Sequence, residues 1–257
     1  MSTQRASVSY TPEARLERAR ARARDLESLI GLRGRRVLEV GCGAGDLCDV
    51  LAKEYECRVV GLDVAAQADW REIGAHPRIE LVQADIASDA LPFESESFDR
   101  IVSFVAWEHI MHPWSALRSC QRLLKSDGKK YLYAWLYGSP LASHLYHMTD
   151  EPWPHLVYSP QELKAKHGLA ELPWYYWCNR LSLQHYLFYF RQLGFLVTHQ
   201  VLIQSELDPA QLEPHRPVLQ QYPDFDLRTD AFQVVLEFDP ASPRAPIEDP
   251  VYRLRSR

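Results

Sequence analysis

The sequence predicts an α/β fold built on a mostly parallel sheet, and the order of its apolar segments is the main reason. Short runs rich in β-branched and other apolar residues alternate with amphipathic stretches through the first half of the chain. Parallel strands need a crossover between them, which is usually a helix, and they are buried on both faces. The strands that we expect cover residues 36–40, 58–62, 79–83, 100–104, 130–135, 195–204 and 231–238.

Four helices are expected around these strands, at residues 12–29, 47–55, 113–124 and 181–193. Pro12 suits the first turn of the first helix, and Gly194 suits the end of the last one. The first helix is rich in arginine, which fits either a solvated face or a lid over an anionic ligand. Asp127–Gly128 predicts a turn before the fifth strand.

The alternation stops between Leu136 and Arg180, where Trp, Tyr, His and Pro residues accumulate. We interpret this segment as an insertion after the fifth strand. Residues 239–257 contain four prolines and few apolar residues, so we expect a loose tail. The expected organisation is an N-terminal helix or lid at 1–29, a main domain at 30–238 with its insertion at 136–180, and the tail.

Composition restricts the class of protein. Hydrophobic residues make up 46% and charged residues 25% of the chain, which is the balance of a folded globular protein. No apolar run is long enough to span a membrane, and Met1–Ala6 lacks the apolar core of a signal peptide. The net charge of −5 disfavours nucleic acid as the main partner. The five cysteines form no CxxC pair, so we expect reduced thiols and a cytoplasmic protein.

The strongest chemical signal is the loop after the first strand, Gly41-Cys42-Gly43-Ala44-Gly45. Glycines there allow a tight turn and let a ligand lie against the backbone. A dinucleotide-binding loop is the obvious alternative, with a pyrophosphate at the helix N-terminus. However, Asp46 follows the third glycine, and Glu39 lies two residues before the first. A carboxylate would repel a pyrophosphate and suits a ligand with a cationic amino or sulfonium group.

Glu39-x-Gly41-x-Gly43-x-Gly45 resembles motif I of the class I S-adenosylmethionine-dependent methyltransferases, in particular those that act on small molecules. Asp63 and Asp85 follow the second and third strands at the family's spacing, and residues 124–128 are similar to the family's turn before strand five. The resemblance covers residues 30–135 well and 181–238 in outline. It implies a Rossmann-like sheet of seven strands, mostly parallel with the last strand antiparallel, and a lid insertion after strand five.

The resemblance also implies S-adenosylmethionine as the cofactor. Asp63 is in the position that binds the ribose hydroxyls, and Asp85 is in the position that meets the adenine. The expected cofactor-binding residues lie at the ends of the first four strands, and they are Glu39, Gly41, Cys42, Gly43, Gly45, Asp63, Val64, Asp85, Ile86 and Phe104.

Histidines are the candidates for the acceptor side of the site. Methyl transfer displaces a sulfonium group, so the protein must align the acceptor, exclude water and keep the nucleophile deprotonated. His109, just after the fourth strand, is the first candidate for a general base, although it could instead pack before the His112–Pro113 turn. His144 and His155 in the insertion are the further catalytic candidates. His144 and His147 lie three residues apart without an acidic partner nearby, so no metal site is expected.

We therefore expect an enzyme that transfers a methyl group from S-adenosylmethionine to a small polar acceptor. Oxygen is the favoured atom. Residues 143–156 resemble a segment of methyltransferases in glycan and natural-product pathways, and this resemblance implies a sugar or a natural-product intermediate as the acceptor. Methylation of RNA or protein, a non-catalytic S-adenosylmethionine-binding regulator and, more remotely, a nicotinamide oxidoreductase remain alternatives. No membrane partner is expected, and the sequence leaves the acceptor and the oligomeric state open.

Overall fold

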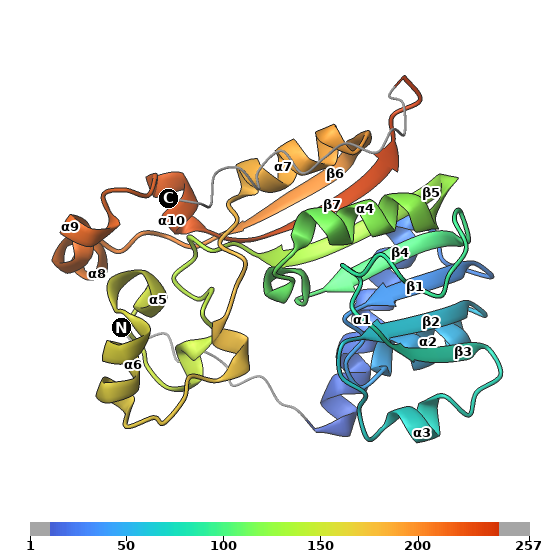
Figure 1. Ribbon diagram of the computed structural model, residues 1–257, viewed down its shortest axis with the longest axis horizontal. Helices are drawn as coiled ribbons and strands as arrows, with labels where there is room; N and C mark the ends of the chain where they lie inside the picture. The colour runs from blue at the N-terminus through green and yellow to red at the C-terminus, as the bar shows by residue number, and fades with distance from the viewer. Residues whose placement is uncertain (1–10, 242–257) are drawn as a thin grey trace.

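The computed structural model describes residues 11–241 and contains a seven-stranded sheet in the order β3-β2-β1-β4-β5-β7-β6 (Figure 1). The strands are β1 (Arg36–Val40), β2 (Arg58–Asp63), β3 (Ile79–Gln83), β4 (Phe98–Phe104), β5 (Leu124–Trp135), β6 (Phe195–Gln204) and β7 (Thr229–Phe238). The first five strands pair in parallel, and β7 is antiparallel to both β5 and β6. The expected Rossmann-like sheet with an antiparallel last strand is confirmed.

Helices cover both faces of the sheet, as buried parallel strands require. The helices α1 (Pro12–Ile30) and α2 (Asp46–Glu54) pack on one face, and α4 (Pro113–Leu123) and α7 (Leu183–Gln192) pack on the other. Side chains alternate between the faces along each strand. Val37 therefore joins the α1/α2 core, while Leu38 and Val40 join the α4/α7 core. The same alternation directs Glu39 toward α1 and α2.

Helix α1 is fixed at both ends. Near its start, the Arg15 guanidinium lies 2.7 Å from an Asp69 carboxylate oxygen and 3.3 Å from Asp46. At its end, the buried Arg100 of β4 donates to the carbonyls of Ile30 and Gly31 at 2.6 and 2.9 Å. Alanines and leucines between these anchors are buried against the sheet. The basic helix is therefore a packed layer of the domain.

Strand β5 differs from the sequence-based expectation. It begins at Leu124, whereas the Asp127–Gly128 signal predicted a turn and a strand from Lys130. Leu124 pairs with Phe98 and Lys129 pairs with Arg100, so β5 carries extra residues that its neighbour lacks. The turn-forming dipeptide lies inside this bulge, and the strand continues through it.

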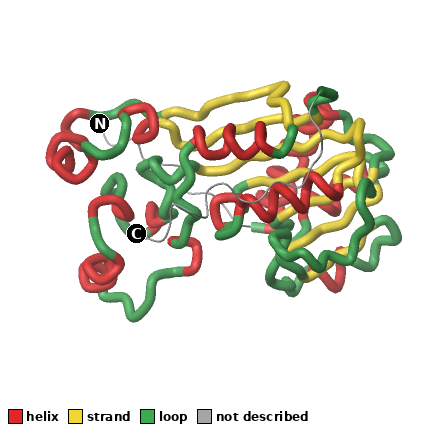
Figure 2. The backbone as a smooth tube through the Cα atoms, turned by 45° about the horizontal axis from the view of Figure 1, so that its top comes forward, coloured by secondary structure: helices red, strands yellow, loops and turns green. Residues whose placement is uncertain are grey.

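Residues 136–180 and 205–228 pack together at one end of the sheet, and we call them the cap (Figures 1 and 2). Trp153 of the first segment is buried with Leu212, Leu219 and Leu227 of the second. The connection between β6 and β7 thus carries short helices. The cap elements are η2 (Leu145–His147), α5 (Pro154–Val157), α6 (Pro160–His167), η3 (Trp174–Tyr176), α8 (Pro209–Leu212), η4 (Glu213–His215), α9 (Arg216–Leu219) and α10 (Asp224–Arg228). The expected tail falls mostly outside the described residues.

The loops after β1 and β4 touch at Gly41 and Ala106. Gly41 has φ of 74°, a backbone conformation that disfavours side chains, and a Cβ atom built on it would overlap the Cβ of Ala106. Ala106 directly precedes η1 (Trp107–His109). Only glycine lets these two strand ends approach so closely.

Replacing Gly41 with alanine should therefore destabilise the protein more than the same change at Gly34. Gly34 has φ of 73° but open space around its Cβ position, so it is a matched control for the backbone conformation alone. We expect Gly34→Ala to lower the free energy of unfolding by about 1–2 kcal/mol. Gly41→Ala should cost roughly 1–3 kcal/mol more because of the overlap. Urea unfolding measures both, and equal losses would show that the contact is not tight.

Candidate functional site

The glycine loop lies at the carboxyl edge of the sheet, where ligands bind in open α/β folds. Gly41, Gly43 and Gly45 have φ values of 74°, 52° and 91°, and Gly45 precedes the first turn of α2. No atom lies within 4 Å of the Cβ position of Gly43. The backbone at Gly43 is therefore open to a ligand.

Glu39 is a buried carboxyl group just below this loop. Its side chain is 4% exposed, and its Oε2 accepts a hydrogen bond from the Cys48 thiol at 3.0 Å. Burial raises the pKa of Glu39 to about 7, and the Cys48 hydrogen bond and the Arg22 charge offset part of this effect. A cationic group bound beside Glu39 would favour its ionised form.

Asp63 connects the end of β2 to the glycine loop. Its Oδ2 accepts from the Gly43 amide at 2.9 Å, and its Oδ1 accepts from the Ala65 amide at 3.1 Å. The side chain is partly exposed, and each oxygen retains a second lone pair for a ligand hydroxyl. Val64, beside it, is 66% exposed, which is unusual for an apolar side chain at a strand end.

Asp85, just after β3, is exposed and accepts from the Ala87 amide at 2.8 Å. Ala84 donates its amide to the Asp63 carbonyl at 2.9 Å, so the ends of β2 and β3 lie side by side. Ile86 is buried in the α4/α7 core, and the Cys42 side chain is buried in the α1/α2 core. Ile86 and Cys42 can therefore offer a ligand only their backbone, as the glycines of the loop do.

Sequence reasoning missed two side chains that shape this region. The Arg22 guanidinium of α1 lies 4.7 Å from the ring centroid of Phe104, and burial lowers its pKa. The Trp70 indole donates to the Gly43 carbonyl at 2.7 Å. Both residues are distant in sequence from the strand ends that they contact. The arginine-rich composition of residues 12–29 was the only signal for the first of them.

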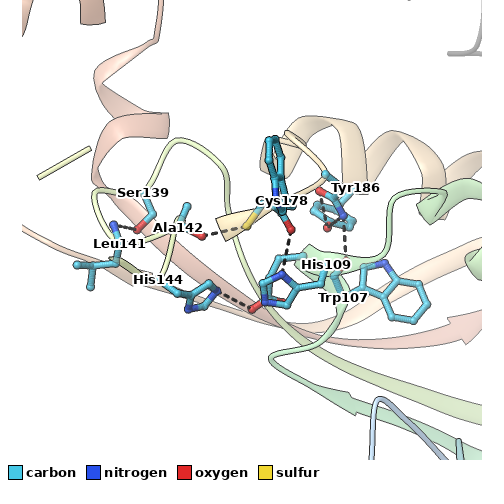
Figure 3. Close-up of polar contacts among 11 residues, drawn as sticks. Trp107, His109, Ser139, Leu141, Ala142, His144, Cys178 and Tyr186 are labelled. Carbon is cyan, nitrogen blue, oxygen red and sulfur yellow. Dashed lines mark hydrogen bonds and ion pairs between the residues drawn. The ribbon is translucent and has the colours of Figure 1, made fainter. Parts of the chain in front are cut away.

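A second polar group lies next to the glycine loop, and it combines Glu108 and His109 of η1 with His144 of the cap (Figure 3). One ligand-type atom from each residue lies within 4.8 Å of the other two. Glu108 is 2% exposed, and neither of its carboxylate oxygens has a hydrogen-bond partner. His144 is also buried, and its Nε2 lies 3.6 Å from Glu108 Oε1. The fold thus brings together two of the expected catalytic histidines and a glutamate that was not expected.

His109 is oriented by the cap. Its Nδ1 lies 3.1 Å from the Trp177 carbonyl, so Nδ1 carries the proton and donates it. The lone pair of Nε2 then remains available. Burial lowers the pKa of His109, and the Glu108 charge and the Trp177 hydrogen bond act in the opposite direction.

Asn179 attaches the cap to η1. Its backbone amide donates to the Glu108 carbonyl at 2.8 Å, and its side-chain amide donates to the Trp107 carbonyl at 2.9 Å and to the Tyr186 hydroxyl at 3.0 Å. These bonds fix the turn that presents Glu108 and His109. Nothing in the local sequence distinguishes Asn179, because its partners come from elements far away along the chain.

His155 of α5 does not belong to this group. Its Nε2 lies 2.8 Å from the Tyr137 carbonyl, so it donates there. Burial lowers the pKa of His155 to about 4, which makes its ring a weak base. The His155 side chain is buried inside the cap, beside the Tyr137 ring.

Comparison with known proteins finds a family match in the first half of the chain. Residues 38–132 match the family model described as a methyltransferase domain. This range begins within β1 and ends within β5, and it includes the glycine loop, Asp63, Asp85 and η1. Among the described residues, no helix is long and apolar enough to cross a membrane.

Curated relatives match about two fifths of the chain. The chain is 37% identical over 110 residues to a ubiquinone biosynthesis O-methyltransferase of Paracidovorax citrulli, covering 40% of this chain and 44% of the relative. A protein of the same name from Aliivibrio fischeri MJ11 is 32% identical over 124 residues, covering 42% and 52%. The matches thus span about half of these relatives.

Solved structures share the fold over more of the chain. Geranyl diphosphate C-methyltransferase from Streptomyces coelicolor, bound to Mg²⁺, geranyl diphosphate and S-adenosyl-L-homocysteine, superimposes with a TM-score of 0.55 at 14% identity. The superposition covers 85% of this chain and 79% of that one. At this identity the likeness concerns the fold alone.

The buried Glu39 predicts a specific pH dependence of stability. Its pKa of about 7 in the folded protein lies above the ordinary value of 4.5, so its stabilising effect is complete below pH 4.5 and is lost as the pH rises through 7. Relative to Glu39→Gln, the free energy of unfolding should fall by up to about 3 kcal/mol over this range.

Urea unfolding of both proteins between pH 4.5 and 8 measures this difference. The comparison with the variant removes the contribution of histidines such as His155, whose lowered pKa acts in the opposite direction. Glu80→Gln, which changes an exposed glutamate of β3, is the control and should leave the profile unchanged. Parallel profiles for the protein and Glu39→Gln would contradict the raised pKa.

Proposed function

We propose that the protein is a class I methyltransferase that transfers a methyl group from S-adenosylmethionine to an oxygen atom of a small polar molecule, and the match of residues 38–132 to a methyltransferase domain supports this. The observation that carries the proposal is the polar group of Glu108, His109 and His144, which begins two residues after Ala106, the residue that contacts Gly41 of the glycine loop. The relatives named O-methyltransferases support oxygen as the acceptor atom.

The residues at the carboxyl edge fit S-adenosylmethionine, which supplies an electrophilic methyl group on a sulfonium when bound. The buried Glu39 carboxyl suits the cationic amino group, and Asp63 offers lone pairs to the ribose hydroxyls. Val64 and Asp85 are exposed at the neighbouring strand ends and suit the adenine. Gly43 leaves its backbone open, and Phe104 with Arg22 closes the side toward α1.

The acceptor side is formed by η1 and the cap. The rings of His144 and His109 lie 5.0 Å apart, and Trp174 and Trp135 flank them at 5.3 and 5.9 Å. His109 presents an unprotonated Nε2, which can accept the proton of a hydroxyl. The oxygen lone pair then forms the bond to the methyl carbon, and the electrons of the broken carbon–sulfur bond remain on sulfur. The products are a methyl ether, S-adenosylhomocysteine and one proton.

A small acceptor is favoured over RNA by the net charge of −5 and by the aromatic side chains beside the histidines. The described cysteines are all buried and free, which suits a reducing cytoplasm. Incubation with methyl-labelled S-adenosylmethionine, a panel of hydroxylated small molecules and total RNA tests the proposal. Label in small ethers supports it, whereas label only in RNA or protein, or none at all, overturns it.

Asp63→Ala should weaken binding of S-adenosylhomocysteine by about tenfold to a hundredfold, because charged hydrogen bonds to the ribose contribute roughly 1.5–3 kcal/mol. Isothermal titration calorimetry measures the affinity. Asp127→Ala is the control, because Asp127 lies in the bulge of β5, at the opposite ends of the strands from the glycine loop. Unchanged affinity in Asp63→Ala would remove Asp63 from the cofactor site.

His109→Ala should lower turnover by about 10²–10⁴-fold, because the group that faces the acceptor oxygen is lost. Affinity for S-adenosylhomocysteine should change far less, since His109 lies on the acceptor side of Ala106. Steady-state kinetics and calorimetry on the same preparation separate the two effects. Equal loss of cofactor affinity would place His109 in the cofactor site instead.

A further inference from the structure

The Glu108 carboxylate is the least expected feature of the structure. It is buried at the end of β4, and both oxygens lack a hydrogen-bond donor. Among the described residues, His144 is its one ionic neighbour, at 3.6 Å, and no lysine or arginine is paired with it. Burying a carboxylate without a partner costs several kcal/mol, so such a group is retained where a ligand compensates it.

The two imidazoles beside Glu108 also have unused nitrogen atoms. His109 donates Nδ1–H to the Trp177 carbonyl, which leaves the lone pair of Nε2 free. An imidazole whose second nitrogen is bound to a backbone carbonyl is the usual arrangement of a metal ligand, because that bond fixes the tautomer and the ring orientation. The buried Nε2 of His144 has no hydrogen-bond partner.

Backbone strain surrounds the same three residues. Val105, three residues before Glu108, has φ of 52°, and His144 has φ of 53°. Positive φ is rare for residues other than glycine and is an outlier for a β-branched residue such as valine. Each such position is strained and persists where the surrounding structure enforces it, often at functional sites.

We propose that Glu108, His109 and His144 bind a divalent transition-metal ion on the acceptor side of the site. Two imidazoles and one carboxylate suit Zn²⁺ and also Fe²⁺, Co²⁺ or Mn²⁺, and they leave further coordination positions open. Mg²⁺ prefers oxygen ligands only and fits this set less well. The three atoms lie within 4.8 Å of one another, compared with roughly 3.3 Å between ligands of tetrahedral zinc, so binding would draw the three side chains closer together.

The rings of Trp174 and Trp135 lie beside His109 and His144, and an acceptor bound to the ion would lie next to these rings. The role of the ion rests on the proposed function. An acceptor hydroxyl bound to the ion loses its proton to water more readily, because the cation stabilises the alkoxide or phenolate. In that case His109 is a metal ligand, and the proton of the acceptor leaves through solvent.

Metal binding is tested without any methyl transfer. The protein is treated with a chelator, desalted and titrated with ZnCl₂, MnCl₂ and MgCl₂ by calorimetry, with neither cofactor nor acceptor present. We expect one Zn²⁺ site and weaker or no binding of Mg²⁺. Glu108→Gln and His144→Ala should each weaken Zn²⁺ binding by more than about 100-fold, because even residues that only support a ligand contribute 10–100-fold. His199→Ala, in the edge strand β6, is the control and should bind as the unchanged protein does.

Cobalt loading of the unchanged protein distinguishes this site from one made by cysteines and does not depend on the folding of any variant. The proposal expects a visible spectrum without a sulfur-to-cobalt charge-transfer band. A thiolate band, no binding of any of the transition-metal ions, or binding that persists in both variants overturns it. Binding of S-adenosylhomocysteine, measured separately on each protein, reports correct folding and tests the proposed function. The two proposals can therefore fail independently.

Discussion

Two carboxyl groups are buried at the ends of the neighbouring strands β1 and β4, and the organisation of the site follows from the need to compensate them. Glu39 is surrounded by α1 and α2, and its partial partners are the Cys48 thiol and the Arg22 charge. Glu108 is surrounded by η1 and the cap, and its ionic neighbour is His144. In the low-dielectric interior, an unpaired carboxylate destabilises the fold. For the same reason, a cation bound beside the carboxylate is held strongly. In our proposals a cationic ligand binds beside each carboxyl group, and the Gly41–Ala106 contact joins the two strand ends that carry them.

The secondary structure around these groups acts as a rigid support. Arg100 and Arg15 bind the two ends of α1 and fix this helix on the domain. The fixed helix places the Arg22 guanidinium over the Phe104 ring. Asn179 holds η1 through its backbone and side-chain amides. Two buried and hydrogen-bonded polar residues, Arg100 and Asn179, therefore help to hold the elements around the two buried carboxyl groups.

The sequence predicted the parts of the fold that depend on local signals. The strands β1 and β3 have the expected bounds, because apolar runs with clear breakers define both their ends. The start of β5 was missed because an Asp127–Gly128 signal can lie in a bulge as well as in a turn. The short helices at 209–228 depend on burial against Trp153, which no local pattern reveals. Likewise, His144 was compared with its sequence neighbour His147, whereas the fold pairs it with Glu108.

The cap is assembled from two chain segments that are joined through the cluster around Trp153, Leu212, Leu219 and Leu227. Neither segment buries these side chains alone, so the apolar surface of each is covered by the other. Suppose that only the segment after β5 were exchanged with that of a relative. The new segment would then no longer match the leucines of the β6–β7 connection. A chimeric protein should therefore receive residues 136–180 and the β6–β7 connection together. For the same reason, sequence changes in these two segments should be correlated among relatives.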